Sequence, residues 1–113
     1  MVLTVEQLGR TNVTGNRLTV ALKVTPDTDA YPSGGELLNV AQYVPNPETI
    51  HAETSTTGIV PVYNRGTTNG GTDGKLMLFQ GDNDAGADGP LAQVVTGNMS
   101  SAIIYITVTG GRA

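Results

Sequence analysis

The lone histidine is the first place to look for chemistry, because a histidine beside a carboxylate serves as an acid–base pair or a metal-binding pair. His51 is the only histidine in the chain, and in an extended segment it shares a face with Glu53. The sequence contains no cysteine, and no strand–turn–helix nucleophile motif accompanies its serines and threonines. We therefore interpret His51 as a polar surface residue and predict no catalytic site.

Oxygen-bearing side chains recur in the loop that follows Gln80, at Asp82, Asn83, Asp84 and Asp88. Such a run invites a calcium interpretation, because carboxylate oxygens are ligands of hard cations. The EF-hand template fails when it starts at Asp82, since Ala87 stands where it needs glycine and Gln93 where it needs glutamate. We predict a solvated turn with no metal site, and an irregular calcium site is the alternative.

The glycine-rich segment 66–74 has the composition of a phosphate cradle but not its sequence. It lacks the Gly-Lys-Ser/Thr ending, and Lys75 begins a strand where a phosphate loop leads into a helix. The chain has no tryptophan, four tyrosines and one phenylalanine, so it offers few aromatic platforms for a sugar. We interpret Tyr43, Tyr63 and Phe79 as core or interface groups and predict no cofactor.

Composition favours one small domain with a neutral surface. The 113 residues, taken as a single domain over 1–113, are 38% hydrophobic and only 14% charged. That is enough apolar content for a core and too much for disorder. A surface rich in Thr, Ser, Asn and Gly can lie against another protein without a large cost for desolvating charge.

The charge pattern disfavours nucleic-acid and membrane partners. The net charge is −4 and the six basic residues are spread along the sequence, whereas a nucleic-acid site needs clustered Lys and Arg. No apolar segment approaches the roughly 20 residues that span a bilayer, and the first residues lack a basic region followed by a long apolar one. We expect a soluble protein made in the cytoplasm.

Alternation of apolar and polar residues with a period of two dominates the chain and predicts strands. In segment 17–25 the apolar residues share one face: Leu18, Val20, Leu22 and Val24. Turn-forming residues precede this segment, so residues 11–14 are predicted to pair with it as a hairpin. Residues 2–6 are predicted as a further short strand.

Three later segments are also predicted as strands, each from its own signal. Pro61 lacks the N–H that a ladder requires, so strand 59–63 is predicted at an edge or a bulge. Segment 75–79 is apolar on both faces, which indicates a strand that is internal or pressed against a neighbouring subunit. The β-branched segment 103–109 is predicted as a central strand that ends at the glycine pair after it.

The remaining segments are shorter or ambiguous. Residues 93–96 are predicted as a short strand, and residues 44–57 as either a long connection or a strand flanked by loops. About seven short strands, glycine-rich turns and at most one short helix indicate an all-β fold. We expect an antiparallel β-sandwich or a jelly-roll-like barrel.

Residues 31–38 combine two backbone signals. Pro32 holds Tyr31 in an extended conformation, which ends the preceding strand. Ser33 followed by Glu36 has the spacing of a capping box and predicts a short helix in the leucines that follow. The whole structural motif comprises Tyr31, Pro32, Ser33, Gly34, Gly35, Glu36 and Leu37.

This segment resembles the Tyr-Pro-Thr/Ser-Gly-Gly-Glu-x-Leu signature of a family of small bacteriophage virion proteins that decorate or cement the capsid. Segments 8–17, 74–79 and 97–102 are similar to the same family in their order and character. The resemblance implies a structural, non-enzymatic protein on the outer surface of the virion, synthesised in the host cytoplasm, that binds the major capsid protein. It also implies self-association, as a homotrimer first and a dimer second.

A receptor- or carbohydrate-binding β-sandwich module of a head fibre or tail is the alternative function. Two predicted strands are candidates for contact with the capsid or with another subunit, because exposed strand edges can add to a neighbouring sheet. Their residues are Val2, Leu3, Val5, Ile59, Val60, Val62 and Tyr63.

Overall fold

The computed structural model describes residues 3–27, 31–32, 34–56, 58–80, 92–93 and 102–112. This part of the chain consists of eight strands, one short 3₁₀ turn named η1 (Val40–Gln42), and their connections. The strands are β1 (Leu3–Thr14), β2 (Arg17–Pro26), β3 (Glu36–Leu37), β4 (Asn46–Thr54), β5 (Ile59–Asn64), β6 (Lys75–Gln80), β7 (Ala92–Gln93) and β8 (Ile104–Gly111).

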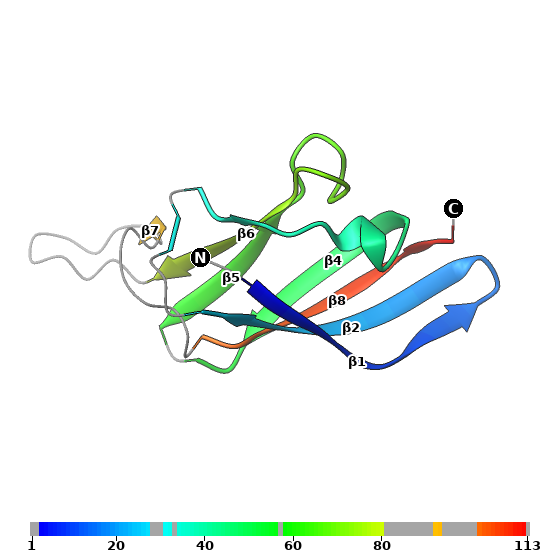
Figure 1. Cartoon of the computed structure of the whole chain (residues 1–113), viewed down its shortest axis with the longest axis horizontal. Helices are drawn as coiled ribbons and strands as arrows, with labels where there is room; N and C mark the ends of the chain where they lie inside the picture. The colour runs from blue at the N-terminus through cyan, green and yellow to red at the C-terminus, as the bar shows by residue number, and fades with distance from the viewer. Residues whose placement is uncertain are drawn as a thin grey trace, which may run out of the picture.

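The strands form two antiparallel sheets (Figure 1). The first sheet has the order β1-β2-β8-β4, and the second has β6 between β3 and β5, with β7 also paired to β6. Because β5 pairs with β6 along its whole length, β3 and β7 must share the other edge of β6. The predicted all-β antiparallel sandwich is confirmed, while its jelly-roll-like form stays a prediction.

The core is built from alternate residues of the central strands. Val20, Leu22 and Val24 of β2 are at most 1% exposed, which confirms the predicted core face of segment 17–25. The rest of the core comes from both sheets and η1, and includes Leu76, Leu78, Ile104, Ile106, Val108, Val40 and Val44. Burial of each such side chain stabilises the fold by about 1.5–3 kcal/mol relative to its exposure.

The predicted hairpin forms, but its first strand is longer than expected. Thr14 pairs with Arg17 across a two-residue turn, and Gly15 takes the positive φ of +62° that such a turn needs at its first central position. Segments 2–6 and 11–14 were predicted as separate strands, and β1 joins them. Its ladder is irregular between Leu8 and Asn12, where Gly9 at φ +71° bends the strand without ending it.

The glycine pair near the end of β8 continues the strand, so the prediction that it ends the strand is wrong. Gly110 and Gly111 pair with both β2 and β4. A Cβ on Gly110 would lie 2.0 Å from the carbonyl oxygen of Asn46, so the missing side chain allows β4 to approach. Segment 44–57 therefore contains a true strand, β4, which is the second of its two predicted forms.

The capping-box prediction is also wrong. Glu36 does not begin a helix but pairs with Leu76 as part of β3. The reason is a turn in which Gly34 and Gly35 have φ of +86° and +95° and the Gly35 N–H donates to the Pro32 carbonyl at 3.1 Å. The helical turn comes later, where the Asn39 side chain accepts a hydrogen bond from the Ala41 N–H at 2.9 Å.

Candidate protein-contact surface

The Tyr-Pro-x-Gly-Gly motif is an anchor for the second sheet. Tyr31 is only 3% exposed, and its hydroxyl accepts a hydrogen bond from the Leu78 N–H at 3.1 Å. A Cβ on Gly35 would lie 2.6 Å from the Leu76 carbonyl oxygen. The motif thus holds β3 tightly against β6. Ser33 lies outside the described residues.

Tyr63 ties β5 to the segment that follows β3. Its hydroxyl donates to the Leu38 carbonyl, while the Leu38 N–H donates to the Gly74 carbonyl at 2.8 Å. Burial raises the pKa of Tyr63 to about 12, because the phenolate is poorly solvated there. This aromatic residue therefore serves the core, as one of the two roles predicted for it.

The outer face of the second sheet carries an apolar surface, which we call the β5 face. Val60 pairs with Phe79 and Val62 with Met77, so these side chains point to the same side of the sheet. Leu37 joins them from β3, since it pairs with Lys75 on the same face of β6. Leu37, Val60 and Val62 are 55%, 40% and 43% exposed, and Met77 and Phe79 are half-buried.

The sequence-based contact residues divide into two groups. Ile59 and Tyr63 of β5, like Leu3 and Val5 of β1, are partly buried and pack against the core. Val60 and Val62 point outward and remain contact candidates, while Val2 lies outside the described residues. Leu37 was missed as a contact residue. Met77 and Phe79 were not named as capsid contacts, although the apolar pattern on both faces of 75–79 and the predicted core or interface role of Phe79 indicated them.

Both strands predicted to supply exposed edges lie at sheet edges. β1 ends the first sheet and β5 ends the second, which confirms the edge position that Pro61 indicated. β1 is exposed on both faces from Glu6 to Thr14, and its Leu8 and Val13 are 38% and 51% exposed. An edge strand of this kind presents backbone N–H and C=O groups that another chain can pair with.

The glycine-rich loop is closed by a carboxylate of its own. Asp73 accepts hydrogen bonds from the N–H and hydroxyl of Thr67, at 2.8 and 2.5 Å. It accepts two more from the N–H and hydroxyl of Thr68, at 3.1 and 2.5 Å. These bonds, the Thr67 hydroxyl first, hold the pKa of Asp73 well below its usual range. The loop therefore has a structural carboxylate where a phosphate cradle would need open N–H groups.

The candidate chemical residues do not assemble into a site within the described chain. The His51 Nε2 lies 4.0 Å from the Glu53 Oε2, with side chains 70% and 69% exposed. No pocket forms there, and no group of three or more potential metal ligands comes together among those residues. Within the described part of the chain, no helix is long and apolar enough to cross a membrane. The acidic loop after Gln80 falls outside the described residues.

No protein-family model, curated protein or solved structure matches this chain. The β5 face and the two edge strands β1 and β5 are the features of the structure that bear on function. The resemblance of segment 31–38 to the virion-protein signature stays a prediction.

Proposed function

We propose that this protein is a non-enzymatic decoration or cement protein, which binds the lattice of the major capsid protein on the outside of a tailed-phage head and stabilises it. The observation that carries the proposal is the β5 face. Apolar side chains exposed together on one sheet face form a candidate protein-binding site, because a partner that covers them removes apolar area from water. The signature in residues 31–38 supports the choice of partner.

The size of the β5 face suits a partner that is present in many copies. From strand spacing and rise, its strands cover on the order of 200 Å² in projection. A stable one-to-one complex needs about 800 Å² on each partner. A weak contact of this size becomes strong when several are made together on a repeating surface. We extend the proposal to self-association, as a homotrimer first and a dimer second, because an oligomer supplies several such contacts.

Heads that lack the protein test the proposal directly. Purified protein should co-sediment with such heads and raise the temperature at which they rupture. Heads made without it should assemble at normal size and rupture at a lower temperature or under osmotic shock. Absence of both binding and stabilisation would refute the proposal and move the receptor- or carbohydrate-binding alternative to first place.

A charge placed on the β5 face tests the surface itself. Val62→Asp should weaken head binding at least about tenfold, because a carboxylate buried in an apolar contact has no partner. His51→Asp is the matched control, since it adds the same side chain to an exposed position on the other sheet. It should change binding less than about twofold. Equal effects of the two variants would show that the β5 face is not the contact.

A further inference from the structure

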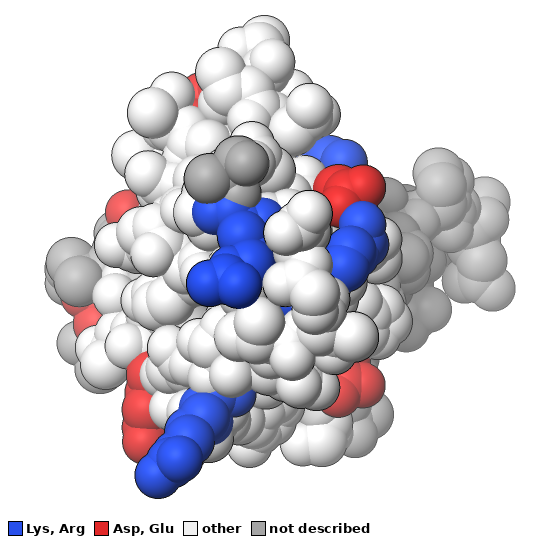
Figure 2. All heavy atoms as spheres, turned by 90° about the vertical axis from the view of Figure 1, so that its right-hand side faces the viewer, with Lys and Arg blue, Asp and Glu red and all other residues white. Residues whose placement is uncertain are grey.

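Three of the four arginines meet at one end of the molecule, although they are far apart in the sequence. We call Arg17, Arg65, Arg112 and the Glu48 between them the arginine end. Figure 2 faces this end and shows basic side chains gathered there around an acidic one. The sequence alone predicted scattered basic residues, so this cluster is a product of the fold.

The sheet register brings the cluster together. Arg17 begins β2 opposite Gly111 of β8, and the Arg112 N–H donates to the Asn16 carbonyl at 3.0 Å. Glu48 lies at the irregular point of β4, beside the same end of β8. Arg65 follows β5 and donates to the backbone carbonyl of Glu48.

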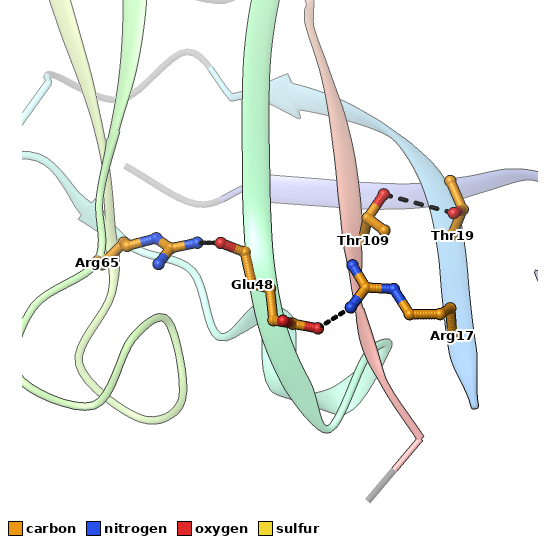
Figure 3. Close-up of polar contacts among 5 residues, drawn as sticks. All are labelled: Arg17, Thr19, Glu48, Arg65 and Thr109. Carbon is orange, nitrogen blue, oxygen red and sulfur yellow. Dashed lines mark hydrogen bonds and ion pairs between the residues drawn. The ribbon is translucent and has the colours of Figure 1, made fainter.

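Glu48 neutralises only part of this charge. Its carboxylate pairs with Arg17, whose side chain crosses β8 where that strand has glycines (Figure 3). Arg65 contacts the Glu48 backbone and not its carboxylate. Among the described residues, no hydrogen bond or ion pair engages the Arg112 side chain. The loop carboxylate of Asp73 accepts its hydrogen bonds from Thr67 and Thr68 and not from an arginine.

The arginine end is thus a positively charged region on a protein whose net charge is negative. Three guanidinium groups against one carboxylate leave a net side-chain charge of +2 there, so the rest of the chain, whose total is −4, carries −6. An acidic partner is attracted to this end and repelled elsewhere, which orients its approach.

We propose that the arginine end binds a carboxylate-rich patch on the surface of the capsid lattice, an inference that rests on the proposed function. The planar guanidinium fork matches a carboxylate with two parallel hydrogen bonds, and arginine is the residue suited to that geometry. A nucleic acid is the less suitable occupant. A local charge of +2 displaces few counterions, and the remaining −6 repels phosphates.

Head binding at graded salt tests the inference. At about 50 mM NaCl, where exposed charges are weakly screened, Arg112→Glu should slow association at least about tenfold. The difference from wild type should shrink towards about twofold by roughly 500 mM, because screening weakens the steering. Arg112 has no described side-chain partner to lose, and equal melting temperatures would verify that the variant is folded.

Lys23→Glu is the matched control. It changes the net charge by the same amount, but it lies six residues along β2 from Arg17, or about 20 Å away. It should change the association rate less than about threefold. If wild type binds heads and the two variants behave alike, the arginine end is not the contact and the proposed function still stands. If wild type does not bind heads, the proposed function itself fails.

A duplex DNA of about 20 base pairs is the second probe. We expect no binding by wild type at about 100 mM NaCl. DNA binding that Arg112→Glu abolishes would assign the cluster to nucleic acid and overturn the inference.

Discussion

At the scale of single residues, a few backbone positions decide whether the second sheet forms. Gly34 and Gly35 both have positive φ, yet only Gly35 lies against a neighbour, the Leu76 carbonyl of β6. The two glycines therefore have different structural roles in the same turn. A side chain at Gly34 would meet only the penalty of positive φ, and a side chain at Gly35 would meet that penalty and a close contact with β6 as well.

Two alanine variants should separate these roles. Gly34→Ala should cost about 1–2 kcal/mol, the usual penalty for a side chain at positive φ. Gly35→Ala should cost about 1–3 kcal/mol more than Gly34→Ala. Its Cβ would lie 2.6 Å from the Leu76 carbonyl oxygen and would push β3 away from β6. Urea unfolding of both variants would measure the difference. Equal costs would show that the close approach carries no weight.

Tyr63 makes the fold sensitive to alkaline pH. Below pH 10 its phenol is protonated in both the folded and the unfolded chain. Its pKa of about 12 in the fold exceeds the ordinary 10.0, so between these values the unfolded chain loses a proton that the folded chain keeps. Stability from this group is therefore full below pH 10 and falls as pH rises to 12.

Tyr63→Phe tests this pH dependence. At pH 7 the variant should lose about 1–3 kcal/mol, because the Leu38 carbonyl loses its donor. The gap between wild type and variant should narrow from pH 10 upward, since the variant has no proton to lose at this position. Free energies of unfolding at pH 9, 10 and 11 would show it, and a constant gap would contradict the assigned burial.

At the scale of elements, alternation predicted the strands that bury one face, because period two is a direct consequence of strand geometry. β2 follows this rule. β6 was predicted from its apolar residues and β8 from its β-branched residues, and both also bury alternate side chains. β3 does not follow the rule, because two residues are too few to show a period and their pairing depends on the Gly34–Gly35 turn. The Asp73 loop was missed for a related reason. Its threonines and glycines indicate a turn, but not which side chain closes it.

Two glycine variants near the end of β8 test how closely β4 packs against β8. Gly110→Ala should destabilise the protein by about 1–3 kcal/mol, because the new Cβ would lie 2.0 Å from the Asn46 oxygen and displace β4. Gly111→Ala is the control, since its Cβ would meet Asn46 Cβ at an ordinary 3.6 Å. It should stay within about 0.5 kcal/mol of wild type. The same displacement should loosen the Arg17–Glu48 pair that crosses β8.

At the scale of the whole molecule, the positions of functional groups in space do not follow their order in the sequence. The chain measures 53 × 24 × 22 Å, and the long strands of the first sheet run obliquely along its longest axis (Figure 1). Sequence reasoning found that β1 and β5 lie at sheet edges and named Val60 and Val62 as contacts, but it did not name the exposed Leu8 and Val13 of β1. It could not find the arginine end, because Arg17 and Arg112 meet through the pairing of β2 and β8, and Arg65 reaches Glu48 of β4 from the other sheet.

The first strand has two roles that one truncation would confuse. Leu3 and Val5 pack against the core, while the backbone of β1 forms a free sheet edge that is a candidate contact with the capsid. Removal of residues 1–5 takes away this packing and the first part of the edge, and it leaves the edge from Glu6 to Thr14. The double variant Leu3→Ala/Val5→Ala takes away only the packing, so it is the matched control.

We expect both variants to melt below wild type, by similar amounts, because each loses the same buried side chains. At a temperature where both are folded, the truncated chain should stabilise deficient heads less than the double variant does. That difference isolates the edge backbone, since pairing with a neighbouring sheet needs main-chain groups and not these side chains. Equal stabilisation would remove residues 1–5 from the contact surface and leave the rest of β1 and the β5 face as the candidate contacts.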